Sequence, residues 1–337
     1  MTVVAASALP AVSVPDAVLM TLAGIAYGAP DAIASYLEQD PLTASDWRLA
    51  WLAAPPDPPD NFAFMAYSAS SKAYAVAIRG TYPNPFSPAY WDDGDEDSPF
   101  GDMVEWPGAS GAKISAGTSK GLTNLLALTD QGGVSLQDAI GRLPAGSRLA
   151  VTGHSLGGTL APVLALSASE RCPSLDVWAT SFAGMTPGNE AFAALFGTGT
   201  KLDGRVRRVY NRLDTVAYGW NAVWATHDFY QPAPKGGPIV AAMLLATAAR
   251  LELGGYDYAP IGTPVALPGK VQPLAIGCEL VAYVIENLHQ HMPDTYLALL
   301  GAPPLPFSIV LASVVMPRTH PAAKQPLSAR PAVVHLG

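Results

Sequence analysis

The chain has 337 residues, of which 50% are hydrophobic and 14% charged, with a formal net charge of −8. A length and apolar content of this order allow a large core in one or two domains. The acidic balance and the lack of any cluster of Lys and Arg argue against nucleic acid as a partner, because phosphate binding requires clustered positive charge.

The N-terminal segment, the apolar runs and the cysteines bear on the compartment of the protein. Residues 1–20 are apolar but have no Lys or Arg before the apolar stretch, so they lack the basic region of a secretory signal. The runs Pro238–Thr247 and Phe307–Met316 are shorter than the ~20 residues of a membrane-spanning helix. We therefore expect a soluble protein, either cytoplasmic or secreted by a route without a recognisable signal peptide. Cys172 and Cys278 form one disulfide or remain two thiols, and the sequence leaves both open.

The first part of the chain predicts two helices followed by two strands. Apolar residues recur at helical spacing over Pro15–Gln39, with an interruption at Pro30, which indicates two short helices. After a proline-rich turn at Ala53–Asn61, the short apolar runs Phe62–Ser68 and Ala73–Arg79 are typical of strands.

The next segment, Gly80–Gly111, has no period and contains many acidic, aromatic and proline residues. A loop of this length in a compact domain is usually functional. An acidic D-x-D-x-D pattern that ends at Asp97 begins like a calcium loop, but Ser98 and Val104 replace the required glycine and glutamate. We therefore expect a solvated acidic loop, and neither a metal site nor a cofactor is predicted anywhere in the chain.

Helices and strands then alternate. The predicted helices are Ser119–Thr129, Ser135–Leu143, Thr159–Ser169 and Asn189–Leu195, and the predicted strands are Arg148–Thr152, Val177–Ala183 and Val206–Tyr210. Strands that alternate with helices need crossover connections, so the sheet is expected to be mostly parallel. Further along, the pattern weakens, and helices are expected at Ile239–Leu253, Leu274–Leu288 and Thr295–Leu300.

One sequence pattern indicates a nucleophile. Gly153-His154-Ser155-Leu156-Gly157 fits G-x-S-x-G, follows an apolar strand and precedes a helix of small residues. Such a turn holds its serine in a strained backbone conformation, and glycines are needed where the flanking segments pass close together. Ser155 is therefore the predicted nucleophile, and the backbone N–H of Leu156 is predicted to donate to an oxyanion.

A serine nucleophile needs a base and an acid to orient that base. In this strand–turn–helix context the acid follows the serine along the chain, and the histidine follows the acid. Asp214 is the preferred acid because it comes just after a predicted strand. The alternatives, in less suitable contexts, are Asp176, Asp203, Asp228 and Asp257.

The base is one of five downstream histidines. His320 and His335 lie in a proline-rich tail, and His227 follows the acid too soon for a residue expected near the last strand or helix. His289 fits the end of the preceding helix, where the dipole favours a cation. His291 is expected on a loop at the start of the next helix and is the preferred base, with His289 as the alternative.

With these residues identified, the chain resembles the class 3 lipases, which include fungal triacylglycerol lipases and bacterial relatives. The likeness covers about residues 60–300 and is most specific at the GHSLGG stretch, residues 153–158. The other similar stretches are Ala75–Thr81 (AVAIRGT), Ser181–Asn189, Val206–Val216, and His291 followed by Tyr296.

The resemblance implies an α/β-hydrolase fold and two further features of the site. Thr81, in the R-G-[ST] turn, would contribute its backbone N–H to the oxyanion hole alongside Leu156, with its hydroxyl as a second candidate donor. The family also places a mobile lid soon after this turn, here residues 82–111, and a static loop anchored by aromatic residues is the alternative. The large side chains of this segment are Phe86, Tyr90, Trp91, Phe100, Met103 and Trp106.

Residues 1–337 are thus expected to form a single α/β-hydrolase domain, with a mostly parallel central sheet flanked by helices. Its catalytic core is expected at about 60–300, the lid at 82–111 and a proline-rich C-terminal tail at 302–337. The expected activity is carboxylic ester hydrolysis, foremost as a triacylglycerol lipase, through a Ser155–Asp214–His291 triad and an acyl-enzyme. Short-chain esterase, phospholipase, polyester depolymerase and acyltransferase activities are the alternatives. The expected partners are an ester or lipid substrate and transient contacts with lipid–water interfaces.

Overall fold

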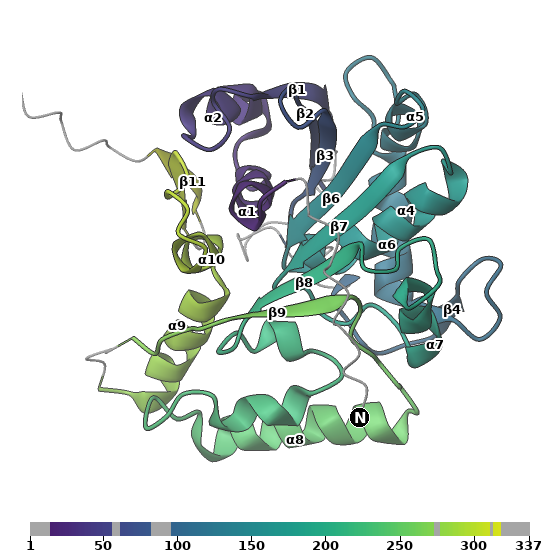
Figure 1. Ribbon diagram of the computed structural model, residues 1–337. Helices are drawn as coiled ribbons and strands as arrows, with labels where there is room; N and C mark the ends of the chain where they lie inside the picture. Colours follow the sequence, from purple (N-terminus) through teal and green to yellow (C-terminus); the bar gives the residue numbers. More distant parts are fainter. Residues whose placement is uncertain (1–13, 56–60, 82–95, 273–276, 311–312, 318–337) are drawn as a thin grey trace, which may run out of the picture.

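Seven strands form a central sheet in the computed structural model of the chain (Figure 1). The structure describes residues 14–55, 61–81, 96–272, 277–310 and 313–317. From one edge to the other, the strands are β1 (Trp47–Leu52), β2 (Ala63–Ser68), β3 (Ala73–Ile78), β6 (Arg148–His154), β7 (Asp176–Phe182), β8 (Val206–Asn211) and β9 (Thr263–Leu267). The first three pair antiparallel and every later neighbour pairs in parallel, so the predicted mostly parallel sheet is confirmed.

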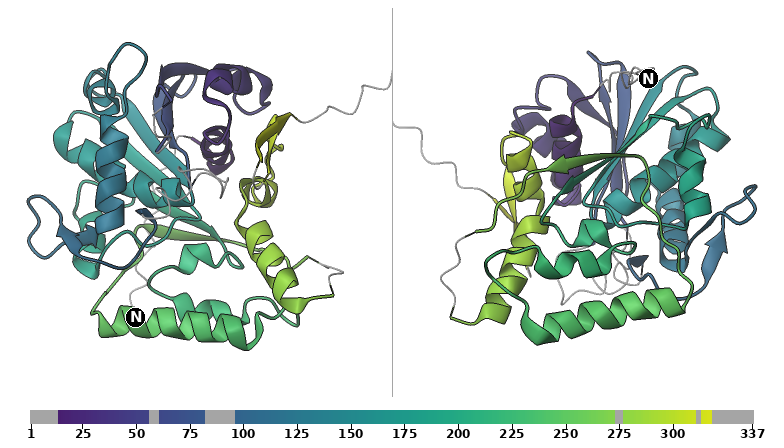
Figure 2. Two further views of the ribbon diagram at one scale, coloured as in Figure 1. Left: turned by 180° about the vertical axis from the view of Figure 1, so that it is seen from behind. Right: turned by 60° about the horizontal axis from the view of Figure 1, so that its bottom comes forward.

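Helices cover both faces of this sheet (Figures 1 and 2). On one face, α1 (Asp16–Ile25) packs against β3, β6 and β7, and it is buried from Leu19 onward. On the other face, α6 (Leu156–Arg171) contacts the same three strands, and α4 (Ala116–Ala127) packs on α6. Nearly all of α6 is buried, because its glycine and alanine residues let the helix lie close to the sheet.

The remaining elements connect the strands or lie at the ends of the sheet. The helices are α2 (Ile33–Gln39), α5 (Leu136–Gly141), α7 (Glu190–Ala193), α8 (Gly237–Leu253), α9 (Glu279–His291) and α10 (Pro293–Leu299). Short 3-10 turns are η1 (Pro30–Ala32), η2 (Ala194–Phe196), η3 (Val216–Tyr218) and η4 (Val223–Asp228). Two hairpins complete the fold, β4 (Met103–Glu105) with β5 (Lys113–Ser115), and β10 (Phe307–Val310) with β11 (Ser313–Pro317).

The pairing of β3 with β6 positions the site. Ile78 at the end of β3 lies opposite Gly153 at the end of β6. The R-G-T turn and the predicted nucleophile turn therefore leave the same edge of the sheet side by side. Because the carboxyl ends of parallel strands meet at one edge, the loops that follow β3, β6 and β8 converge there.

Several elements differ from those expected from the sequence. The sheet begins at Trp47, before the expected start of the catalytic core at about residue 60, and it ends with β9. Neither of these edge strands was predicted from the sequence. The hairpin β10–β11 occupies part of the segment expected as a C-terminal tail. His291, expected on a loop, is instead the last residue of α9, and α10 begins at Pro293, a residue suited to the first turn of a helix.

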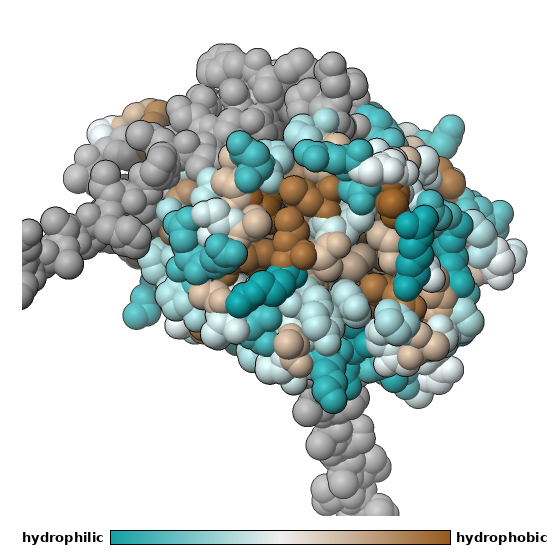
Figure 3. All heavy atoms as spheres, turned by 90° about the horizontal axis from the view of Figure 1, so that it is seen from above, coloured by the Kyte–Doolittle hydropathy of each residue, from teal (hydrophilic) through white to brown (hydrophobic). Residues whose placement is uncertain are grey.

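The two ends of the molecule differ in the surface they present. α8 lies along one end of the molecule (Figure 2). The opposite end, seen from above Figure 1, gathers apolar residues in a patch surrounded by hydrophilic ones (Figure 3).

Candidate active site

Ser155 occupies a sharp turn between β6 and α6. Its backbone has φ 60° and ψ −127°, a left-handed conformation that residues with side chains rarely adopt. A Cβ atom on Gly153 would lie 2.2 Å from the carbonyl oxygen of Gly157, and one on Gly157 would lie 2.3 Å from that of Ile78. Glycine is therefore required on both sides of the serine, as the pattern predicts. Ser155 itself is 9% exposed.

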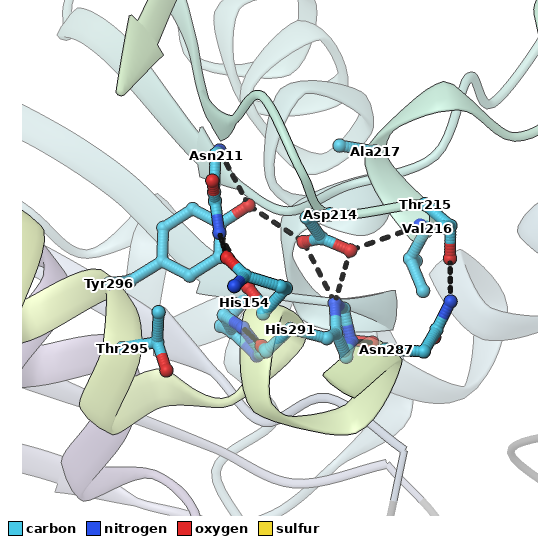
Figure 4. Close-up of polar contacts among 12 residues, drawn as sticks. His154, Asn211, Asp214, Thr215, Val216, Ala217, Asn287, His291, Thr295 and Tyr296 are labelled. Carbon is cyan, nitrogen blue, oxygen red and sulfur yellow. Dashed lines mark hydrogen bonds and ion pairs between the residues drawn. The ribbon is translucent and has the colours of Figure 1, made fainter. Parts of the chain in front are cut away.

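An unbroken series of hydrogen bonds joins Ser155, His291 and Asp214. The Ser155 hydroxyl lies 2.8 Å from Nε2 of His291. Nδ1 of the same ring lies 2.9 Å and 3.1 Å from the two carboxylate oxygens of Asp214 (Figure 4). Since a carboxylate only accepts, Nδ1 carries the proton and Nε2 is free to accept the hydroxyl proton of Ser155. The structure thus brings together three residues that come from the ends of β6, β8 and α9.

Asp214 is completely buried and has further donors besides His291. One carboxylate oxygen accepts from the backbone N–H of Val216 at 3.0 Å, and the other accepts from the Tyr296 hydroxyl at 2.7 Å (Figure 4). The hydroxyl of Tyr296 in turn accepts from the N–H of Asn211 at 2.9 Å. These bonds hold the carboxylate in one orientation and compensate for its burial.

The surroundings of His291 favour its protonated form. Burial lowers the pKa of His291, but the charge and hydrogen bonds of Asp214 and the charge of Asp97 outweigh burial, so the pKa is raised above its usual value. The negative end of the α9 dipole acts in the same direction. The protonated form of the His291 ring is therefore stabilised at this position.

The turn after β3 and the start of α6, which contain the predicted oxyanion donors Thr81 and Leu156, flank Ser155. The N–H of Leu156 belongs to the first turn of α6, where N–H groups have no partner within the helix. Gly80 runs against the nucleophile, since a Cβ there would lie 3.0 Å from that of Ser155. The Thr81 hydroxyl donates to a carboxylate oxygen of Asp97 at 2.6 Å, so it is already engaged within the protein.

Asp97 corrects the expectation of a solvated acidic loop. Its Oδ1 atom is shut off from solvent, and burial raises the pKa of this carboxyl to about 6, although the Thr81 hydrogen bond and the charge of His291 both lower it. Asp97 is the last residue of the D-x-D-x-D pattern, which lacks the glycine and glutamate of a calcium loop. The pattern therefore ends in a residue of the site. Asp97 and Thr81 are 16 positions apart, and their hydrogen bond depends on how the chain folds. No local sequence pattern predicts this contact.

Residues 82–95 of the predicted lid lie outside the described residues, and residues 96–111 are described. Of its six large side chains, Phe86, Tyr90 and Trp91 fall in residues 82–95. The described end of the segment includes Trp106, which is 4% exposed, packs on Phe192 and donates to Glu170. This tryptophan anchors its end of the segment to the protein.

The other candidates lie apart from Ser155 or carry other contacts. Asp176 pairs with Arg148 and Arg205 at the start of β7, and Asp228 pairs with His227. His320 and His335 fall outside the described residues. Cys172 and Cys278 are not bridged to each other. Within the described ranges, no group of three or more His, Cys, Asp or Glu side chains is placed to hold a metal ion.

Two residues of the site were not assigned a role from the sequence. His154 occupies the variable position before the nucleophile, and its ring lies 4.8 Å from that of His291, centroid to centroid. Tyr27, which follows α1, places its hydroxyl 3.0 Å from Nδ1 of His154. An aromatic residue just after an N-terminal helix gives no signal of a site so far along the chain.

The parallel sheet, the strained serine between strand and helix, and the histidine and carboxylate beside it define a serine hydrolase of the α/β type. Residues 75–220 match the model of the class 3 lipase family, which confirms the resemblance seen in the sequence. The matched segment of the chain is therefore similar to the class 3 lipases. No curated protein matches the chain by sequence.

The chain is similar to several solved structures. M37 lipase is 24% identical, with a TM-score of 0.68, and the match covers 86% of this chain and 93% of that one. A Rhizomucor miehei lipase in complex with its propeptide is 23% identical, with a TM-score of 0.44 over 60% of this chain and 61% of that one. A lipase from Rhizopus microsporus var. chinensis is 22% identical, with a TM-score of 0.43, covering 60% of this chain and 67% of that one.

Proposed function

We propose that the chain hydrolyses carboxylic esters with Ser155 as nucleophile, His291 as general base and Asp214 as the group that orients the base. The observation that carries this proposal is the series of hydrogen bonds from the Ser155 hydroxyl through His291 to Asp214. The backbone N–H groups of Leu156 and Thr81 are the proposed oxyanion donors, since they flank the serine on two adjacent turns.

The proposed reaction has two halves. In the first, Nε2 of His291 takes the hydroxyl proton as Ser155 Oγ attacks the ester carbonyl, and the oxyanion of the tetrahedral intermediate accepts from the two N–H groups. The protonated ring then gives its proton to the departing alcohol, which leaves an acyl-enzyme. In the second half, His291 takes a proton from water, the hydroxide attacks the acyl carbon, and the proton returns to Ser155 as the carboxylic acid departs.

We further propose that the substrates are lipid esters met at a lipid–water interface, with triacylglycerols first. The exposed apolar residues of α8 and α9 support this view. On α8, Ile239 is 59% exposed, Met243 65% and Leu245 58%, and on α9 Val284 is 48% exposed. α8 carries no charged residue before Arg250. Large apolar side chains exposed on helices are typical of surfaces that contact lipid.

Both helices are connected along the chain to elements of the site. α8 follows the loop that starts at the carboxyl end of β8 with Asp214, and α9 ends in His291. Contact of these helices with a lipid surface would bring the proposed nucleophile close to the ester groups. Among the helices in the described ranges, none combines the length and the apolar character needed to span a bilayer.

The experiment that tests the mechanism compares the wild type with Ser155→Ala on nitrophenyl esters of increasing acyl length and on emulsified triglycerides. We expect the variant to lose at least about a thousandfold in kcat. Ser169→Ala, which removes another buried serine hydroxyl from α6, is the matched control and should retain wild-type activity. Hydrolysis by Ser155→Ala at the wild-type rate would exclude the mechanism.

The same substrates separate the remaining activities. A preference for acyl groups of two to four carbons without any response to an interface would favour a short-chain esterase. Phospholipid vesicles, polyester films and an added alcohol acceptor test phospholipase, depolymerase and acyltransferase activity in turn. Comparison of His289→Ala with His291→Ala tests the base, and only the second is expected to abolish turnover.

A further inference from the structure

The last turn of α9 is held by side chains from distant segments. His291 ends this helix, and the last carbonyl groups of an α-helix have no partner within it. Asn211 Nδ2 donates to the Gln290 carbonyl at 2.9 Å, and Nε2 of His154 lies 2.7 Å from the His291 carbonyl (Figure 4). The backbone of the proposed base is therefore fixed by the residue that precedes the proposed nucleophile.

The direction of these bonds assigns the tautomer of His154. A carbonyl oxygen only accepts, so Nε2 of His154 carries the proton, and in a neutral imidazole Nδ1 is then an acceptor. The Tyr27 hydroxyl lies 3.0 Å from Nδ1 and supplies the matching donor. His154 is 1% exposed and Tyr27 5%, so water is largely kept from these atoms. Tyr27 donates to His154, and His154 donates to the backbone of His291.

Tyr27 lies where three parts of the site meet. A Cβ atom on Gly80 would lie 2.0 Å from the Tyr27 hydroxyl oxygen, 2.5 Å from the His154 carbonyl oxygen and 3.0 Å from Cβ of Ser155. The phenol ring of Tyr27 is therefore packed against both the R-G-T turn, which contains Gly80, and the turn that contains Ser155. A shift of either turn would change the hydrogen bond to His154.

His154 must also remain uncharged for the proposed reaction. Its ring lies against that of His291, with 4.8 Å between centroids. Burial holds the pKa of His154 well below its usual value, and the charge of His291 acts in the same direction, although the bond to the His291 carbonyl opposes them. A neutral ring at this position does not repel the imidazolium that forms on His291 during the reaction.

We propose that His154 and Tyr27 are positioning residues, which hold the backbone of His291 so that its Nε2 stays on the Ser155 hydroxyl. This proposal rests on the proposed function, in which His291 is the base. Neither residue is assigned a contact with the reacting ester. Their effect should therefore fall on kcat, because small displacements of a base reduce the rate of proton transfer more than the binding of substrate.

The test begins with Tyr27→Phe, which removes one hydroxyl and leaves the packing volume unchanged. On a water-soluble nitrophenyl ester we expect kcat to fall about tenfold with KM nearly constant, as a buried acceptor loses its donor. Tyr36→Phe removes a hydroxyl from α2 in the same N-terminal region and is the matched control, with wild-type kcat expected. Equal kcat in the two variants would overturn the proposal.

His154 is tested by two replacements and a double-mutant cycle. His154→Leu should lower kcat by about tenfold or more, and His154→Gln should restore part of it, because an amide can donate to the His291 carbonyl and accept from Tyr27. In the His154→Leu background, Tyr27→Phe should have no further effect on kcat. An undiminished effect of Tyr27→Phe in that background would overturn the proposal.

The failure of this proposal can be told from failure of the proposed function. If Ser155→Ala is inactive while Tyr27→Phe and His154→Leu keep the wild-type kcat, only the positioning role is wrong. If Ser155→Ala keeps its activity, the proposed function is wrong as well. Thermal unfolding of each variant, followed by circular dichroism, shows whether activity is measured on folded protein. Should His154→Leu fail to fold, the comparison of Tyr27→Phe with Tyr36→Phe decides alone.

Discussion

At the scale of single residues, Asp97 couples the two sides of the site. Its carboxylate accepts from Thr81 on the oxyanion side, and its charge raises the pKa of His291 on the base side. Asp97 therefore contacts the proposed oxyanion donor and raises the pKa of the proposed base. An Asn at this position would keep an acceptor for Thr81 while removing the charge.

We expect Asp97→Asn to shift the acid limb of the pH profile of kcat/KM toward lower pH. His291 must be neutral to accept the serine proton, and its raised pKa brings the loss of activity on acidification to a higher pH than for an ordinary histidine. Removal of the Asp97 charge lowers that pKa, so the variant keeps a larger share of its activity in mild acid. An unchanged acid limb would show that the charge of Asp97 does not affect the pKa of His291.

The same variant has a predicted effect on stability. The pKa of Asp97 is raised from 3.8 to about 6 in the folded protein, so the folded state binds more protons than the unfolded state between these values. Wild-type stability therefore falls as pH rises through this window. The Asn variant has no carboxyl at this position and does not lose stability in this way. The Tm of Asp97→Asn relative to wild type should increase from about pH 4 to about pH 7. A constant difference in Tm would contradict this assignment.

Tyr296 is expected to act through Asp214. Its hydroxyl donates to the carboxylate that orients His291, and Tyr296 is completely buried. Tyr296→Phe leaves this carboxylate with one donor fewer, so we expect kcat/KM to fall about three- to tenfold. Nitrophenyl ester kinetics measure the effect. Tyr36→Phe again provides the comparison, and equal kinetics in both would show that the Tyr296 bond is dispensable.

At the scale of elements, strands with a regular burial pattern were predictable and edge strands were not. β6 and β7 are short apolar runs buried along most of their length, which the sequence shows directly. β1 is an edge strand with exposed and buried positions and an irregular register at Trp51, and β9 contains Pro264. Proline in a strand is typical of edge strands, and local sequence does not specify which strand lies at the edge.

The apolar surface of α8 makes a prediction about substrate presentation. Ile239→Ser combined with Met243→Ser should lower the rate on emulsified triglyceride by about tenfold, because two exposed apolar side chains lose their favourable transfer into lipid. The rate on a water-soluble ester should stay unchanged. Ala145→Ser, at an exposed apolar residue in the loop that precedes β6, is the control and should change neither rate. Equal losses on both substrates would instead indicate a folding defect.

At the scale of the whole molecule, the net charge of −8 should affect binding to lipid surfaces. An acidic protein is repelled by anionic lipid, and salt screens that repulsion beyond about 8 Å at physiological ionic strength. In vesicle sedimentation at low salt, we expect binding to zwitterionic vesicles to exceed binding to anionic vesicles by about threefold. The difference should shrink as salt is added. Tighter binding to anionic vesicles would mean that local positive groups outweigh the net charge.

Parts of the site that lie close together in the sequence could be predicted, whereas contacts between distant segments could not. GHSLGG is a local pattern, and the expected order of acid and base led to Asp214 and His291, which the structure brings to Ser155. Tyr27 and His154 are 127 positions apart, and their contact depends on how α1 packs against β6. A contact of this kind follows from the tertiary arrangement and has no counterpart in spacing or composition.

The contact between Tyr27 and His154 has a consequence for how the enzyme would lose activity. Both Tyr27 and His291 lie outside residues 75–220, so the site is complete only when segments from both sides of that central part have docked. Segments with exposed side chains, such as α9, open before the central strands in many proteins. Under mild denaturation, turnover should therefore disappear while most of the circular dichroism signal of the sheet persists. Residual activity would then report the docking of these outer segments, and the spectroscopic signal would report the survival of the sheet.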